Sequence, residues 1–187
     1  MDPPDRKQRF AEMYLAHYAD VLGYIRRRTD SPHDAADAVA ETFTIAWRRL
    51  ADVPDGPLAR PWLLGVARRV LANGRRAETR RGELVARLGA ELAVWQARSP
   101  DPAEAADRAA VRAAFRRLRP GDREVLALAS WEGLSHDEIA VVLGCSRATV
   151  RIRLHRARKR LAKELRAAGL DVSRYGARAV ALSEGTT

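Results

Sequence analysis

The residues best suited to chemistry in this sequence are basic side chains gathered near its C-terminal end. Nine Lys or Arg lie between residues 147 and 166, against a single acid, Glu164. Such cations neutralise phosphates, and arginine can also hydrogen bond to the edge of guanine. This nearly unopposed basic stretch favours binding to a nucleic acid. The alternative is a basic helix that only packs by its apolar side.

Two helices predicted in this region would position the basic residues. Ser135 and Glu138 have the spacing of a capping box, which starts a short helix that ends at Gly144. Ser146 then caps a second helix. Its apolar residues recur every three or four positions at Val150, Leu154, Ala157, Leu161 and Leu165. Two helices joined by such a tight turn predict a helix-turn-helix, whose second helix lies in the DNA major groove.

A second basic stretch, residues 60–81, contains seven Arg and one Glu. Trp62 stands near its start, and arginines beside an aromatic ring suit single-stranded DNA, which they bind through phosphates and stacked bases. Packing of Trp62 in a core is the alternative. The whole chain carries a net charge of +10, but outside the two basic stretches it is net acidic. We therefore expect two separate nucleic-acid contacts instead of general attraction.

An acidic strip, Asp34, Asp37 and Glu41, recurs along a helix predicted over residues 32–50. Two interpretations are open on this pattern alone. Acids near the start of a helix stabilise its dipole, which explains Asp34 better than Glu41. Alternatively, the strip is a docking face for a basic protein surface.

Composition predicts an all-α chain. The sequence has 187 residues, of which 47% are hydrophobic and only 6% aromatic, and no run of alternating β-branched residues predicts a strand. We expect two small helical domains joined by a linker, the second with the helix-turn-helix. Their expected limits are residues 8–81 for the first domain, 82–100 for the linker, 101–168 for the second domain and 169–187 for a frayed tail.

Several function classes are disfavoured by what the sequence holds. Cys145 is the one cysteine, so no disulfide forms within the chain, which suits a reducing cytoplasm. The four histidines have no cysteine neighbours at metal spacing, so neither a metal nor another cofactor is expected. The N-terminal residues do not have the pattern of a signal peptide, and no apolar run approaches a membrane span, so membrane insertion is not expected.

Three segments resemble, in order, the small sigma factors of bacterial RNA polymerase, of the extracytoplasmic-function (ECF) type. Residues 34–47, DAADAVAETFTIAW, resemble the helix by which these factors bind the polymerase. Residues 60–68, RPWLLGVAR, resemble the helix after the promoter-reading loop. Residues 133–161 resemble the helix-turn-helix that reads the upstream promoter element. This order, with a linker between, is far more specific than a helix-turn-helix alone.

The resemblance implies a site for core RNA polymerase in the first domain, which would correspond to sigma region two. Its residues would be Asp34, Asp37, Val39, Glu41, Thr42, Phe43 and Trp47. Under this resemblance, the acidic strip is the face of this chain that docks on the clamp of the polymerase.

The resemblance also implies two promoter contacts. The loop 51–58 and the helix after it would engage the −10 element as it melts, through Trp62, Arg68, Arg69, Arg75 and Arg76. The second domain, corresponding to region four, would read the −35 element as duplex. Its contacts would be Ser146, Arg147, Thr149, Arg151, Ile152, Arg153, His155 and Arg156.

Two positions depart from the family pattern. Arg69 stands where many relatives have Asn, which alters the surface expected to recognise the −10 element. Ile152 stands where many relatives have Ser. An exposed isoleucine there could meet a thymine methyl group.

The function implied is that of a non-enzymatic, promoter-specific initiation factor that binds core RNA polymerase, directs it to −35 and −10 elements and helps melt promoter DNA. The family also implies an anti-sigma factor as a partner. One alternative is a free-standing helix-turn-helix regulator that binds duplex DNA alone, which leaves the acidic strip unexplained. Another is a Mg²⁺-dependent enzyme acting on nucleic acid, but the sequence offers neither a second acidic cluster nor a glycine-rich phosphate loop.

Overall fold

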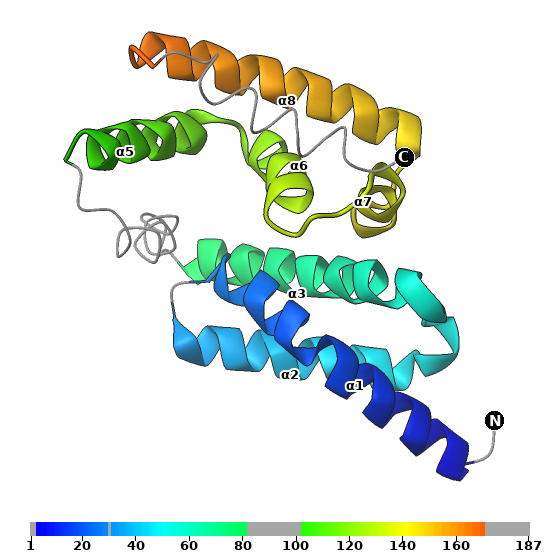
Figure 1. Cartoon of the computed structure of the whole chain (residues 1–187). Coiled ribbons are helices and arrows are strands. Elements are labelled where there is room, and N and C mark those ends of the chain that lie inside the picture. The colour runs from blue at the N-terminus through cyan, green and yellow to red at the C-terminus, as the bar shows by residue number, and fades with distance from the viewer. Residues whose placement is uncertain (1–2, 30, 82–101, 171–187) are drawn as a thin grey trace. The chain divides into compact units, whose positions relative to one another are not determined.

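The computed structural model describes residues 3–29, 31–81 and 102–170, and every regular element in these ranges is helical (Figure 1). The expected all-α class is confirmed. In chain order the elements are α1 (Pro3–Arg26), α2 (Pro32–Arg48), the 3₁₀ turns η1 (Leu50–Asp52) and η2 (Gly56–Leu58), α3 (Ala59–Arg81), α5 (Pro102–Arg117), α6 (Pro120–Ser130), α7 (His136–Leu143) and α8 (Arg147–Ala167).

The described helices fall into two compact units. The first unit contains α1, α2 and α3, and the second contains α5, α6 and α8, with α7 as far as Ala140. The limits of the functional domains stay predictions. The expected linker, residues 82–100, lies outside the described residues, as does the expected tail from residue 171 onward.

Local signals start and pack α2 in the first unit. The Ser31 hydroxyl accepts a hydrogen bond from the Asp34 backbone N–H at 3.2 Å, and Pro32 occupies the first helical turn. One side of α2 is apolar and buried. It packs with fully buried residues of α1 and α3, so the core of this unit includes Val21, Tyr24, Ile25, Ala35, Ala46, Leu50 and Leu63.

Two helices of the first unit are longer than the sequence pattern suggests. The sequence pattern predicts a start of α1 at Phe10, but the helix starts at Pro3. The sequence pattern predicts an end of α3 near Arg76, but the helix continues to Arg81 through Gly74. Glycine inside a helix costs only about 1 kcal/mol relative to alanine, so Gly74 does not stop α3.

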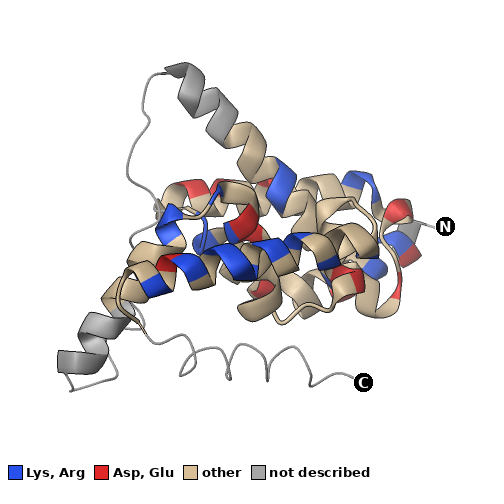
Figure 2. Ribbon diagram, turned by 90° about the horizontal axis from the view of Figure 1, so that it is seen from above, with Lys and Arg blue, Asp and Glu red and all other residues tan. Residues whose placement is uncertain are grey.

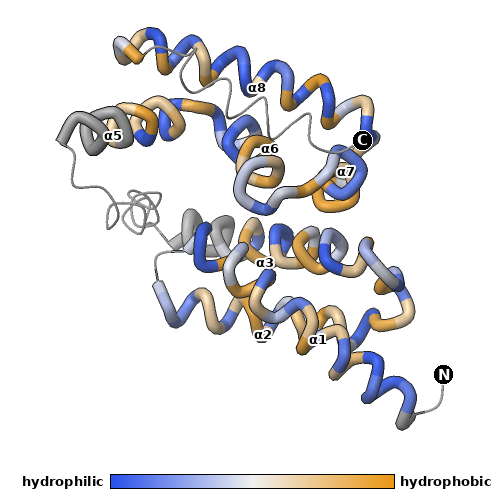
Figure 3. Tube along the Cα trace, in the orientation of Figure 1, coloured by the Kyte–Doolittle hydropathy of each residue, from blue (hydrophilic) through white to orange (hydrophobic). Residues whose placement is uncertain are grey.

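The predicted helix-turn-helix is present and consists of α7 and α8. The Ser135 hydroxyl accepts from the Glu138 N–H at 3.3 Å, while the Ser135 N–H donates to Glu138 Oε2 at 2.8 Å, which completes the capping box before α7. Gly144, with φ of +63°, turns the chain after α7. Ser146 then caps α8, whose stripe packs on α5 and α6. Along α8, hydrophobic and hydrophilic residues alternate (Figure 3).

The end of α8 corrects one expectation. Gly169 has φ of +75°, and the Leu170 N–H donates to the Leu165 carbonyl at 3.1 Å, which is the bonding of a Schellman cap. Leu170 is buried against Ala114 and Leu165. The second unit therefore reaches residue 170, and the frayed tail predicted from residue 169 was wrong for these first two residues.

Candidate functional sites

One side of α8 is buried, and the basic residues of the helix lie on its exposed side. Val150, Leu154 and Ala157 are buried, and basic residues recur along the ribbon of α8 (Figure 2). Seven of the eight predicted DNA contacts are exposed, namely Ser146, Arg147, Arg151, Ile152, Arg153, His155 and Arg156. Their cationic groups are thus available to an anion, while the buried stripe fixes the helix that holds them.

The first turn of α8 uses its predicted contact residues structurally as well. Ser146 Oγ accepts from the Thr149 N–H at 3.2 Å, and the two hydroxyl oxygens lie 2.9 Å apart. Arg147 Nη1 lies 3.3 Å from Asp137 Oδ2, with both side chains more than half exposed. A solvated ion pair of this kind contributes little, so a phosphate can replace it.

Ile152 lies on the exposed face of α8, in the second turn of the helix, and is 51% exposed. It starts a row at steps of four, three and four residues, which brings it into line with basic side chains. The other members of the row are Arg156, Lys159 and Lys163, all exposed. An apolar side chain within a cationic row is the arrangement expected of a base-reading surface.

One basic residue of α8 has a different partner, which sequence reasoning missed. Arg160 Nη1 contacts both carboxylate oxygens of Asp122, at 2.8 and 2.6 Å. Asp122 lies in the first turn of α6 and is buried, whereas the Arg160 side chain is 43% exposed. The pair joins α8 to α6, so Arg160 positions the helix rather than adding freely to its basic face.

The acidic strip lies on the exposed side of α2. The Asp37 side chain is 71% exposed, and its Oδ2 lies 3.8 Å from His33 Nε2. Glu41 is exposed and Asp34 is half-buried. Between these acids and α1, the surface of α2 consists of small side chains, Ala36 and Ala40. The strip is therefore reachable by a partner that also covers the alanines.

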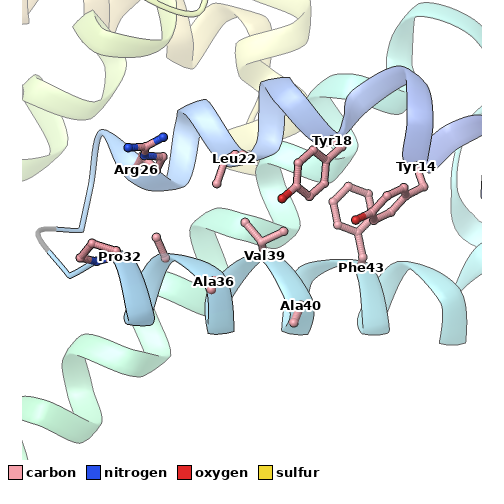
Figure 4. A pocket seen from close by; sticks show the side chains of 10 residues that line it. Tyr14, Tyr18, Leu22, Arg26, Pro32, Ala36, Val39, Ala40 and Phe43 are labelled. Carbon is pink, nitrogen blue, oxygen red and sulfur yellow. The ribbon is translucent and has the colours of Figure 1, made fainter. Parts of the chain in front are cut away.

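An aromatic groove of about 500 Å³ runs between α1 and α2 beside those alanines (Figure 4). The ring centroids of Tyr14 and Phe43 are 4.6 Å apart, and those of Tyr14 and Tyr18 are 5.2 Å apart. The lining residues are Tyr14, Tyr18, Leu22, Arg26, Pro32, Ala35, Ala36, Val39, Ala40 and Phe43. No sequence signal identified this groove, because it is formed by two helices together.

Three predicted polymerase contacts are interior residues of the first unit. Val39 and Phe43 are 6% and 4% exposed and form part of the groove lining. Thr42 is fully buried, and its hydroxyl donates to the Ala38 carbonyl at 2.6 Å. Thr42 therefore packs inside this unit, and its role in binding the polymerase stays a prediction. Trp47 is half-buried beneath the Arg6 guanidinium, which lies 4.7 Å from its ring centroid.

The predicted −10 residues all lie on α3. Trp62 is half-buried, with the Arg49 guanidinium 6.0 Å from its ring centroid, so both packing and stacking suit it. Arg68 is half-buried and Arg69 is exposed. Arg75 and Arg76 lie further along the same helix. All five predicted −10 residues therefore belong to one helix. The loop before this helix adds an exposed apolar residue, Leu58.

The described ranges contain neither a metal-binding cluster nor a membrane-spanning helix. Among them, no three or more His, Cys, Asp or Glu side chains form a group that could hold a metal ion. No helix found there has the length and apolar content needed to cross a bilayer. Cys145 is half-buried in the turn before α8, which fits a small packing residue.

Two family models match this chain. The model described as "Sigma-70 region 2" matches residues 13–81, and "Sigma-70, region 4" matches residues 108–161. Among curated proteins, an RNA polymerase sigma-E factor of Streptomyces coelicolor is 32% identical over 162 residues, covering 87% of this chain and 89% of the relative. An ECF RNA polymerase sigma factor, SigL of Mycobacterium tuberculosis, is 31% identical over 160 residues, covering 84% and 89%.

Among solved structures, the sigma factor RpoE in complex with the anti-sigma factor NepR, from Bartonella quintana, has a similar fold. The TM-score is 0.60 with 22% sequence identity, and the match covers 84% of this chain and 96% of that one.

Proposed function

Because the chain belongs to the sigma-70 family of bacterial RNA polymerase sigma factors, in the ECF class, we propose a division of its promoter-directing function between the two units. The second unit reads the −35 element as duplex, with α8 in the major groove. The first unit binds the core polymerase through α2 and engages the −10 element through the loop 51–58 and α3. The observation that carries the proposal is the exposed basic face of α8, set on a capped helix-turn-helix.

The polymerase site combines the acidic strip with the aromatic groove. Asp37 and Glu41 suit a basic surface, and the groove beside Ala36 and Ala40 suits the apolar ridge of a helix. Val39 and Phe43 line the groove, so a partner in the groove would contact them although both are nearly buried. A partner helix with an apolar ridge flanked by Arg or Lys fits both features.

The DNA contacts act in two ways. Arginines near the start of α8, such as Arg151, read base edges, while Arg153 and Arg156 bind phosphates. In the first unit, unstacked bases of the opened strand are held near Trp62, which couples recognition to melting because duplex DNA does not offer such bases. The chain itself makes and breaks no covalent bond, acts in the cytoplasm and has an anti-sigma factor as a further partner.

Binding of the labelled full chain to sigma-free core RNA polymerase tests this proposal. We expect tight binding that is lost when Asp37 and Glu41 are both replaced by Arg. The matched control is Asp5→Arg, which reverses an exposed acid on the first turn of α1, away from the strip. Plain duplex DNA is titrated in parallel. Specific binding to duplex DNA without affinity for core polymerase would contradict the proposal and indicate a free-standing transcriptional regulator.

A further inference from the structure

Arg9, on the second turn of α1, holds the chain segment that follows α2. Its Nη1 donates to the Leu50 carbonyl at 3.2 Å. Its Nη2 donates to the Val53 carbonyl and to Asp55 Oδ1, both at 2.8 Å. One side chain thus fixes three points of a segment that is more than forty residues away in sequence.

Arg6 makes a similar contact one turn earlier on α1. Its Nη2 donates to the Trp47 carbonyl at 2.9 Å. The carbonyls bound by Arg6 and Arg9 belong to residues 47, 50 and 53, and so follow each other at three-residue steps. Carbonyls at the end of a helix lack intrahelical partners, and cations are favourable there. We call Arg6 and Arg9 the arginine clamp.

The clamp fixes the anchored start of the loop and leaves its tip exposed. Leu50 and Val53 are 1% and 5% exposed, so they root the segment in the first unit. Asp55, Gly56 and Leu58 are exposed. Fixing a loop before binding removes the entropy cost of ordering it at the moment of recognition.

We propose that Arg9, supported by Arg6, is a positioning residue for promoter opening. It presets the loop 51–58 in the form that captures unstacked bases of the −10 element. This inference rests on the proposed function of that loop. Arg9 itself does not touch DNA, because its guanidinium is occupied by the protein's own acceptors.

The backbone carbonyls, more than the carboxylate, carry the effect. The Asp55 side chain is 91% exposed, so its ion pair with Arg9 is screened by water. The Arg9 side chain is 30% exposed, and its two bonds to carbonyls are partly buried. Replacing Arg9 should therefore loosen the loop more than replacing Asp55 does.

Hydrogen–deuterium exchange on the full chain is the first test. Arg9→Met keeps the aliphatic stem and removes the donors, so we expect faster exchange of the amides of residues 50–58, with a smaller rise for Asp55→Ala. The matched control is Glu12→Ala, an exposed position one turn further along α1, for which exchange in the loop should not change. Unaltered loop exchange in Arg9→Met would overturn the proposal.

The second test uses the holoenzyme and the strongest promoter that the wild-type holoenzyme selects from a randomised duplex library. For Arg9→Met we expect the preference for the selected over a scrambled −10 element to fall by about tenfold, the order expected for losing charge-assisted hydrogen bonds. Core affinity and the preference at the −35 element should stay unchanged. An equal fall at both elements would indicate general destabilisation and overturn the proposal.

A third variant separates this inference from the proposed function. It replaces residues 51–58 by a Gly-Ser loop of equal length, and we expect promoter opening to be lost. If opening survives this replacement, the proposed function of the loop fails, and the role of Arg9 fails with it. If the replacement abolishes opening while Arg9→Met opens promoters normally, the clamp proposal alone fails.

Discussion

At the scale of single residues, Ile152 is the position on α8 that charge alone does not explain. It is 51% exposed, yet it lies in a row of cationic side chains. A large apolar side chain in this place adds nothing to the core. Contact with the C5-methyl group of thymine in the major groove would remove it from water.

Replacing Ile152 by Ala should therefore weaken discrimination between thymine and uracil at one position of the −35 element. Burial of a single methyl group is worth about 0.8 kcal/mol, so the effect is roughly fourfold. Competition binding of the holoenzyme to promoters with single thymine-to-uracil substitutions measures it. Arg156→Ala is the control, because it should lower affinity for both bases alike. A wild-type holoenzyme indifferent to every such substitution would rule out the contact.

Arg151 is exposed near the start of α8 and is our candidate for a base edge. We expect Arg151→Ala to reduce −35-dependent initiation. The loss of binding free energy at the −35 element should be about 1–3 kcal/mol, the range of one bidentate contact to a base. Binding to core polymerase should not change. Run-off transcription from promoters with and without a scrambled −35 element, together with a core-binding titration, makes the comparison. An equal loss of core binding would refute the assignment.

At the scale of elements, the turn of the helix-turn-helix depends on the backbone of Gly144. Its φ is +63°, and a Cβ built there would meet no atom within 4 Å. Gly121, in the first turn of α6, has equally open space but no positive φ. The two glycines therefore differ in conformation and not in crowding.

This pair gives a matched prediction. Gly144→Ala should destabilise α7 and α8 by about 1–2 kcal/mol, the cost of the left-handed conformation for an L-residue. Gly121→Ala should be neutral or stabilise α6 by about 0.4–1 kcal/mol, because it lowers the entropy of the unfolded chain. Opening free energies from native-state hydrogen exchange distinguish these outcomes. Similar losses for both variants would contradict the conformational explanation.

The elements could be predicted from sequence where their causes are local. Ser135 and Ser146 were identified as caps because their partners lie three residues away. The apolar stripe of α8 was predicted because helical periodicity reveals it. The limits of α1 were missed, since the pattern before Phe10 is polar and Arg6 takes its partner from another helix.

The candidate sites were only partly predictable for the same reason. The exposure of Arg151 and Glu41 followed from their helical faces. By contrast, the Asp122–Arg160 pair spans 38 residues, and the groove combines Tyr14 with Phe43 from another helix. Backbone carbonyls also carry no sequence signature, so the acceptors of Arg9 could not be foreseen. Nonlocal partners thus mark the limit of sequence reasoning here.

At the scale of the whole molecule, basic and acidic side chains are concentrated on different helices. The chain carries +10, with nine cations between residues 147 and 166, while α2 exposes an acidic strip. Surfaces of opposite charge allow one chain to attract both a basic protein surface and DNA. The count of cations overstates the surface that meets DNA, because Arg160 is bound to the buried Asp122.

Salt dependence should reveal this difference. Each lost phosphate contact lowers the slope of log affinity against log salt by about 0.9. We expect Lys159→Gln to lower the slope of holoenzyme binding to duplex promoter by about that amount. Arg160→Gln should leave the slope unchanged while it weakens the packing of α8. A reduced slope for Arg160→Gln would mean that Asp122 releases it to DNA.

The separation of buried and exposed sides along α8 has a consequence for how such proteins diversify. Val150, Leu154 and Ala157 secure the helix, so Ile152 and Arg156 on the opposite side can change without threatening the fold. Under the proposed role of α8 at the −35 element, mutations there would alter which promoters this protein selects. A duplicated gene could acquire its own set of targets within a few substitutions, and engineers could assign separate promoters to variants of one scaffold.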